Sequence, residues 1–169
     1  MLKLLIRLFA LLCVAVLAAC SDIAADPALE VYLVRHAEKT TEQTDPGLTE
    51  AGKARAELLA EKLTDAGIDR IHSSDYVRTR DTAAPLAKRL GLDVELYDPR
   101  DLPTLAAQLQ AEGGTHLVVG HSNTTPQLTE LLGGDGGAPI VEATEYDRLY
   151  RVSVDADGEV TSELIRFGE

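Results

Sequence analysis

Two histidines and two arginines of this sequence have the residue types and the placement that phosphoryl transfer needs. Arg35-His36 and His121 each come directly after an apolar run, and Arg78 begins a helical pattern. Guanidiniums bind phosphate oxygens through charge-assisted hydrogen bonds, and a neutral imidazole is a nucleophile near neutral pH. Phosphoryl transfer depends mainly on positioning and charge stabilisation. We therefore predict that His36 accepts a phosphoryl group while Arg35, Arg78 and His121 bind its oxygens.

Alternating strand and helix patterns must position these four residues. Strand patterns cover 29–34, 68–72, 94–96 and 116–119, and helix patterns cover 49–66, 77–90, 102–110 and 125–132. Two further alternating runs, 146–154 and 159–167, predict a hairpin at the end of the chain. This order predicts an α/β fold, a three-layer α/β/α sandwich whose mainly parallel sheet has antiparallel C-terminal strands.

The predicted sheet brings the four residues to one place. Ligands of open α/β sheets bind outside the carboxyl ends of the strands. The loops that begin at Arg35, Ser73 and Gly120 follow three predicted strands, so we expect them to share one edge.

The composition makes a cluster of cations notable. The 169 residues contain 16 Lys and Arg against 28 Asp and Glu, a net charge of −12. Such an acidic chain repels nucleic acid, and aromatic residues at 4% with no Trp make a base-stacking platform improbable. The length predicts one domain, and no nucleic-acid partner is expected.

The N-terminus has the organisation of an export signal. Lys3 and Arg7 precede an apolar run, 8–19, that is shorter than the about 20 residues a spanning helix needs. Leu17-Ala18-Ala19-Cys20 resembles the lipobox of bacterial lipoproteins. That resemblance implies cleavage before Cys20, lipidation of this residue and a membrane anchor facing the periplasm. Ser21, in place of Asp, resembles the sorting pattern for the outer membrane. An uncleaved membrane anchor is the alternative.

Three motifs resemble those of the histidine phosphatase superfamily, also called phosphoglycerate mutase-like. Arg35-His36-Ala37-Glu38 resembles the Arg-His-Gly signature, residues 73–83 resemble the second motif with Arg78 as its pocket arginine, and Gly120-His121-Ser122-Asn123 resembles the third. The resemblance implies a metal-independent transfer through a phosphohistidine on His36, without any cofactor. The short chain is similar to the small single-domain branch. The expected domains are a signal peptide at 1–19, a lipidated tether at 20–28 and a histidine phosphatase domain at 29–169.

None of the three motifs identifies the proton donor for the leaving group. The stretch 95–101 offers Asp98 as the first choice and Asp101 as the second, and the alternative is that its acids are solvated loop residues. A leaving group of low pKa, as in phosphohistidine, would need no donor. Glu38 is a candidate for binding substrate or orienting an arginine, or is simply exposed.

The predicted function is a phosphatase that hydrolyses phosphate monoesters or phosphoramidates of small molecules. The alternatives are a phospho-ligand-binding module without turnover and a phosphomutase. His72 and His116 lack the placement at strand ends beside candidate pocket arginines that His36 and His121 have, and are expected to be structural. A metal site is not expected, because the histidines lack i, i+4 spacing and nearby arginines would repel a cation.

Overall fold

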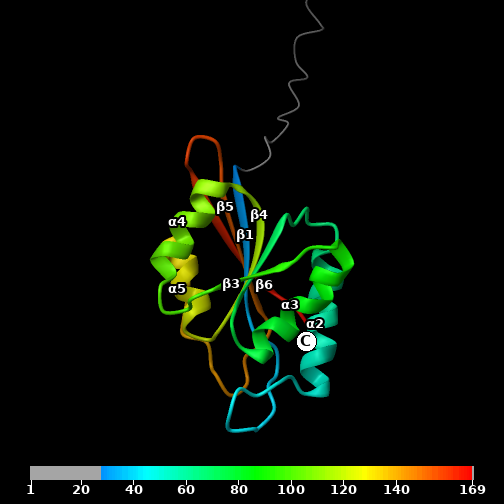
Figure 1. The fold of residues 1–169 in the computed structure, drawn as a ribbon. Helices are drawn as coiled ribbons and strands as arrows, with labels where there is room; N and C mark the ends of the chain where they lie inside the picture. The colour runs from blue at the N-terminus through cyan, green and yellow to red at the C-terminus, as the bar shows by residue number, and fades with distance from the viewer. Residues whose placement is uncertain (1–27, 169) are drawn as a thin grey trace, which may run out of the picture.

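A six-stranded sheet forms the middle layer of the computed structural model, which describes residues 28–168 (Figure 1). The strands lie in the order β3-β2-β4-β1-β5-β6. The predicted signal peptide, Cys20 and most of the predicted tether lie outside the described residues. Within residues 28–168, no helix is both long and apolar enough to cross a bilayer.

The parallel part of the sheet contains its four N-terminal strands. They are β1 (Leu29–Arg35), β2 (Arg70–Ser74), β3 (Val94–Tyr97) and β4 (Gly114–Gly120). β4 pairs in parallel with β1 and with β2, and β2 pairs in parallel with β3. Every residue of β1 is buried, as a strand covered on both faces requires.

The antiparallel part completes the other edge of the sheet. β5 (Arg148–Val154) pairs antiparallel with β1, and β6 (Val160–Arg166) pairs antiparallel with β5. The predicted C-terminal hairpin is therefore confirmed.

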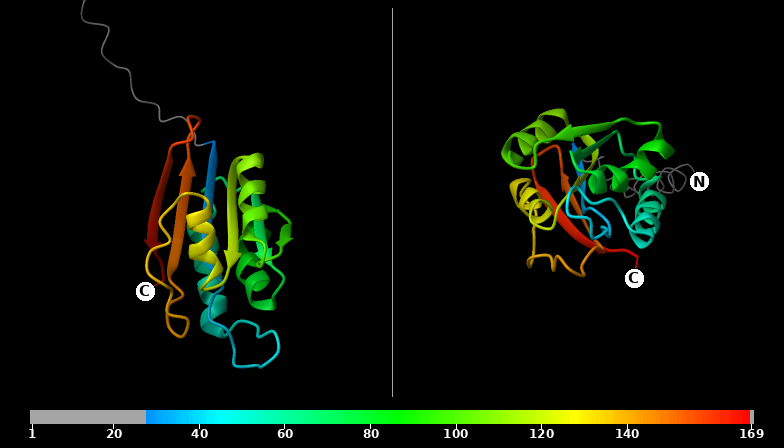
Figure 2. Two further views of the ribbon diagram at one scale, coloured as in Figure 1. Left: turned by 90° about the vertical axis from the view of Figure 1, so that its left-hand side faces the viewer. Right: turned by 60° about the horizontal axis from the view of Figure 1, so that its bottom comes forward.

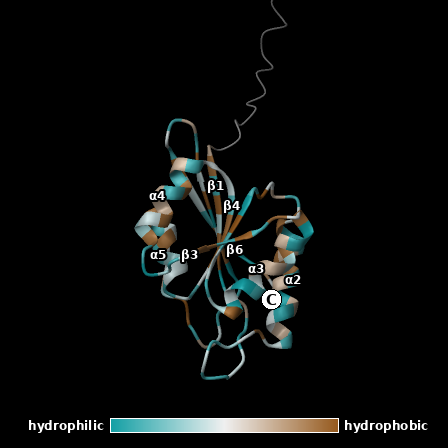
Figure 3. Ribbon diagram, in the orientation of Figure 1, coloured by the Kyte–Doolittle hydropathy of each residue, from teal (hydrophilic) through white to brown (hydrophobic). Residues whose placement is uncertain are grey.

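Two pairs of helices cover the two faces of the sheet (Figures 1 and 2). α2 (Glu50–Leu63) and α3 (Val77–Leu90) pack on one face, and α4 (Leu102–Glu112) and α5 (Thr124–Leu131) pack on the other. Each pair buries its apolar side chains against its own face of the sheet, which gives two separate cores. In the ribbon of Figure 3, hydrophobic residues gather in the strands between the two pairs of helices. The predicted three-layer α/β sandwich is confirmed.

The ends of the elements differ from the sequence patterns by a few residues. The predicted helix 49–66 is helical only to Leu63, because residues 64–67 form a turn with Gly67 at φ +72°. The predicted strand 68–72 runs from Arg70 to Ser74, and β5 begins at Arg148 rather than at 146. Apolar periodicity finds an element but does not fix where its hydrogen bonding stops.

α2 begins close to the loop that follows β1. Thr49 caps the helix, since its Oγ1 accepts a hydrogen bond from the Gly52 N–H at 3.0 Å. A Cβ on Gly52 would collide with the main-chain oxygen of Glu38. Glycine at this position therefore allows α2 to approach the loop closely.

The strand ends that carry the candidate residues meet at one edge of the sheet. In the register of the sheet, Arg35 pairs with Gly120, and Ser73 pairs with Val119. The next residue, His36, donates its N–H to the Gly120 carbonyl at 3.0 Å. The shared edge expected from the sequence is therefore present.

Candidate active site

The rings of His36 and His121 meet at the carboxyl edge of the sheet. Their centroids lie 5.6 Å apart, and the ring planes make an angle of 68°. His36 is buried and His121 is partly buried. β1 and β4 are neighbours, so residues that follow their last positions are brought together although 85 positions separate them in the chain.

The hydrogen bond of His36 to the main chain fixes its tautomer. Nδ1 lies 2.7 Å from the carbonyl oxygen of Ala37. A carbonyl only accepts, so Nδ1 carries the proton and donates it. The lone pair is then on Nε2, which is the nitrogen able to attack phosphorus.

The surroundings keep both rings neutral. Burial, followed by the charges of Arg35 and Arg78, lowers the pKa of His36 to about 3, although the bond to Ala37 opposes this shift. Burial and the charges of Arg78 and Arg35 lower the pKa of His121 to about 4. Both imidazoles are therefore uncharged at neutral pH.

His121 is held at both of its ring nitrogens. Nδ1 lies 3.4 Å from an Arg78 terminal nitrogen, and Nε2 lies 2.9 Å from Ser74 Oγ. Since a guanidinium only donates, Nδ1 is an acceptor and Nε2 carries the proton that Ser74 accepts. Ser74 Oγ in turn donates to Thr79 Oγ1 at 3.2 Å. Tyr76 meets the edge of the His121 ring at a centroid distance of 5.0 Å.

Arg35 is held by the main chain of the segment before β5. Its guanidinium donates to the carbonyl oxygens of Glu145 at 2.9 Å and Glu142 at 2.7 Å. It also lies over the ring of Tyr146, 4.1 Å from the centroid. The centroid of the Tyr146 ring is 6.1 Å from that of the His36 ring, so the tyrosine borders the histidine on this side.

Arg78 enters from the first turn of α3. One terminal nitrogen lies 3.6 Å from Asp45 Oδ1, and the guanidinium lies 4.5 Å from the centre of the Tyr76 ring. The Asp45 carboxylate also accepts a hydrogen bond from the Val77 N–H at 3.0 Å, at the start of α3. Thr82, one turn further on, accepts from the Ala37 N–H at 3.0 Å and so ties α3 to the His36 loop.

Each of the two arginines has one buried donor without a partner among the described residues. These donors are Arg35 Nε and Arg78 Nε. A buried donor without a partner is uncommon in folded proteins. An anion bound between the guanidiniums would supply acceptors, so the donor set fits a phosphate group.

Three other candidates have partners elsewhere. Both oxygens of Asp98, which is exposed, accept from Arg100, and these hydrogen bonds lower the pKa of Asp98. Asp101 caps α4 by accepting from Thr104. Glu38 forms a two-pronged ion pair with Arg55, whose Nε and terminal nitrogen lie 2.8–3.0 Å from its oxygens. The structure thus brings His36, Arg35, Arg78 and His121 together, and gives these three carboxylates partners outside that group.

Several pocket residues escaped the sequence patterns. Ser74 lies within the second motif but has no signal of its own, and Asp45 is one of three acids in the polar loop 37–47. Tyr146 lies 111 positions after Arg35, so only the pairing of β1 with β5 brings the two together.

The comparisons with known proteins agree with this geometry. Residues 31–99 match the family model of the histidine phosphatase superfamily (branch 1), a segment that includes Arg35, His36 and Arg78. A probable phosphoglycerate mutase GpmB from Yersinia pestis (strain Pestoides F) is 42% identical over 79 residues, which are 43% of this chain and 36% of that protein. The chain therefore aligns with little more than a third of the curated relative.

Two solved structures resemble the whole described fold. The protein histidine phosphatase SixA complexed with tungstate has a TM-score of 0.65 and 21% identity, over 82% of this chain and 97% of that chain. A putative phosphohistidine phosphatase SixA from Agrobacterium tumefaciens has a TM-score of 0.63 and 26% identity, over 83% and 99% of the two chains.

Proposed function

We propose that this chain belongs to the histidine phosphatase superfamily and hydrolyses small phosphorylated compounds through a phosphohistidine on His36. One observation carries the proposal: the unprotonated Nε2 of a neutral His36 lies near two arginines whose buried Nε–H donors have no partner among the described residues. A phosphate dianion is the ligand that such a pocket would bind most strongly.

Each step of the proposed reaction uses a group already described. The Nε2 lone pair of His36 attacks phosphorus, and the bond from phosphorus to the leaving group breaks with its electron pair. Arg35 and Arg78 bind the phosphoryl oxygens as their charge redistributes, and His121 becomes a further donor when the bound dianion favours protonation of its Nδ1. Water then attacks the phosphohistidine, the P–N bond breaks, and inorganic phosphate leaves with neutral His36 restored.

The ionisation of Asp98 supports a proposal for the substrate class. Hydrogen bonds from Arg100 lower the pKa of Asp98, which therefore stays ionised and is a poor acid at neutral pH. Asp98 remains our candidate donor, but the site suits a leaving group that departs without strong acid catalysis. Phosphoramidates such as phosphohistidine and other substrates with good leaving groups meet this condition, so we propose them ahead of alkyl phosphates.

The test compares turnover of a phosphoramidate and an aryl phosphate in the presence of a chelator. His36→Ala is expected to abolish turnover of both, and rapid quenching of the wild type with labelled substrate should trap label on His36. Undiminished turnover by His36→Ala would refute the assignment. Binding without label or turnover would instead support a phospho-ligand-binding module, and label transferred to an acceptor other than water would indicate a mutase.

The location of the protein is a separate proposal that rests on the sequence. We propose cleavage before Cys20 and a lipid anchor that holds the domain on the periplasmic side of the outer membrane. β1 begins at Leu29, so the tether between anchor and fold would be short. Metabolic labelling with a fatty acid, followed by membrane fractionation, tests this. Cys20→Ser should lose both the label and the membrane association.

A further inference from the structure

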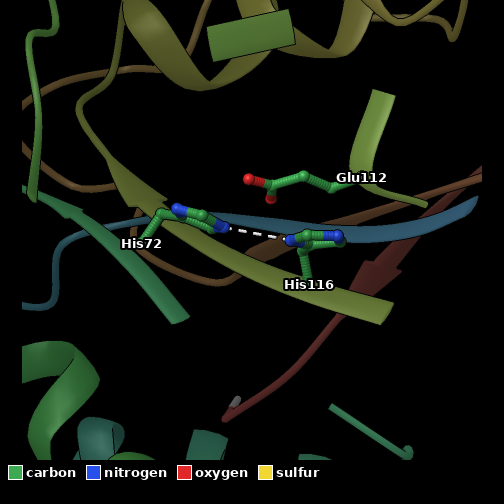
Figure 4. Close-up of side chains that lie close together, drawn as sticks. All are labelled: His72, Glu112 and His116. Carbon is green, nitrogen blue, oxygen red and sulfur yellow. Dashed lines mark hydrogen bonds between the residues drawn. The ribbon is translucent and has the colours of Figure 1, made fainter. Parts of the chain in front are cut away.

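We propose that His72, His116 and Glu112 form a binding site for a divalent transition-metal ion, with Zn²⁺ as the best-fitting ion, separate from the phosphate pocket. Figure 4 shows the three side chains pointing toward one another between the sheet and the end of α4. One nitrogen of each ring and one carboxylate oxygen all lie within 4.8 Å of one another.

The pairing of two strands creates this cluster. His72 lies at the centre of β2 and His116 near the start of β4, 44 positions later. In the sheet, His116 of β4 pairs with Arg70 of β2, and His72 is two residues after Arg70 in β2. Side chains two residues apart in a strand point to the same face, so the side chains of His72 and His116 share one face of the sheet. Glu112 is the last residue of α4, the helix that covers this face.

The donor set and its spacing suit zinc. Two imidazoles and one carboxylate are ligands typical of Zn²⁺, whereas Mg²⁺ and Ca²⁺ prefer oxygen alone. His72 Nε2 lies 3.0 Å from His116 Nδ1. Zn–N bonds of about 2.0–2.1 Å at a tetrahedral angle place two nitrogens about 3.3 Å apart, so the rings need to separate by only a few tenths of an ångström.

The main chain already orients the His116 ring as a ligand. His116 Nε2 lies 2.6 Å from the Gly113 carbonyl oxygen, so Nε2 is the donor and Nδ1 holds the lone pair. A ligating histidine in a metal site usually donates its other N–H in this way. Without metal, His72 Nε2–H donates to His116 Nδ1. On binding, that proton moves to Nδ1 of His72, which frees its Nε2 and releases no proton from either ring.

Arg70 would compete with the metal ion for the carboxylate of Glu112. It lies 3.5 Å from Glu112 and 3.6 Å from Glu95, and 46% of its side chain is exposed. Gln108 also donates to Glu112 Oε1 at 3.1 Å. Because Arg70 has a second carboxylate partner and access to solvent, it can release Glu112 to a metal ion. Removing its charge should therefore tighten binding.

The proposed metal site is separate from the candidate active site. His116 is four residues before Gly120 in β4, a separation of about 13 Å at the usual rise per residue. A bound ion would join β2, β4 and the end of α4, and would stabilise the fold rather than take part in catalysis.

Isothermal titration of the purified full-length protein in mild detergent with Zn²⁺ tests the proposal, and Co²⁺ absorption reports the coordination geometry. We expect one equivalent of Zn²⁺ to bind, and bound Co²⁺ to show the absorption intensity of a tetrahedral site. The affinity for Zn²⁺ should fall by about 100-fold in His116→Gln and by about 10-fold or more in Glu112→Gln. Arg70→Gln should bind more tightly. His121→Asn is the matched control for adventitious binding at the other pair of histidines, and should bind as the wild type does.

Two results would overturn the proposal: no binding to the wild type below millimolar Zn²⁺, or binding that His121→Asn removes and His116→Gln retains. Circular dichroism identifies any variant that does not fold. If His116→Gln fails to fold, Glu112→Gln decides the question, because this residue is at an exposed helix end. Unchanged affinity in Glu112→Gln would then refute the site.

Discussion

Adjacent buried serines at the end of β2 allow a sharp test of how His121 is positioned. Ser73 and Ser74 are both fully buried, but only Ser74 Oγ contacts the His121 ring, at 2.9 Å from Nε2. Ser73 Oγ instead donates to the main-chain oxygen of Ser74. Each serine can be replaced by alanine, so the two variants lose the same atom and differ in the contact that is lost.

The size of the effect follows from the lost hydrogen bond. A buried donor left without its acceptor costs about 1–3 kcal/mol. In Ser74→Ala this donor is the Nε2–H of His121, and its hydrogen bond to Ser74 holds the ring so that Nδ1 faces Arg78 in the pocket used by the proposed reaction. At 1.36 kcal/mol per factor of ten in rate, kcat should fall by about 5- to 150-fold. KM should change less, because the guanidiniums that bind the ground-state phosphate are untouched.

Steady-state kinetics with a chromogenic aryl phosphate, together with urea unfolding, separate this effect from a general loss of stability. Ser73→Ala should keep kcat within about threefold of the wild type and lose about 0.5–1.5 kcal/mol of stability. Equal losses of kcat in the two variants would show that His121 does not depend on Ser74 for its orientation.

Three further predictions follow from charge, titration and packing. Arg78→Ala should lower kcat/KM by about 100-fold or more. The control Arg80→Ala should change kcat/KM by less than about twofold, because the exposed Arg80 side chain pairs with Asp75. Similar losses in the two variants would contradict the assignment of Arg78 to the pocket. Burial is the largest cause that lowers the pKa of His36 and His121 to about 3 and 4 from 6.5. The unfolded chain therefore binds more protons between these values, and the free energy of unfolding should fall as the pH drops from 6.5 toward 4, as measured by urea unfolding at each pH. A stability that stays constant over this interval would mean that the folded rings are charged. Gly52→Ala should destabilise the protein by about 1–3 kcal/mol in thermal unfolding, because the added Cβ meets the main-chain oxygen of Glu38. This loss is expected even though alanine favours helices over glycine by about 1 kcal/mol. A raised melting temperature would contradict the close approach of α2 to the loop after β1.

Much of the fold could be predicted because local pattern and global arrangement agree in this chain. The alternation of strand and helix patterns, with continuous burial of β1, determines a parallel sheet with helices on both faces. The positions of His36 and His121 followed from the same rule, since both lie directly after central strands. Element ends were less predictable because a turn such as 64–67 can contain a residue, here Ala66, that also favours helices.

Contacts between distant segments could not be predicted in the same way. The pocket's Tyr146 and the main-chain acceptors of Arg35 come from a segment with no regular pattern. The expectation that His72 and His116 are simply structural rested on their neighbours in sequence, whereas strand register brings their rings within hydrogen-bond distance and adds Glu112. The candidate acid Asp98 was chosen by its place after β3, and its pairing with Arg100 depends on side-chain conformations that no spacing encodes.

The way in which Arg35 is held has a consequence for how relatives of this protein can diverge. The guanidinium is anchored by carbonyl oxygens of Glu142 and Glu145, which every amino acid possesses. Replacing the exposed Glu142 side chain therefore leaves this anchor in place, whereas the Glu145 side chain also accepts hydrogen bonds from the Val141 N–H and from Arg148 that hold the backbone in its path. The exposed positions 141–144 before β5 can therefore accumulate substitutions and acquire new substrate preferences, while the arginine that this segment supports stays fixed.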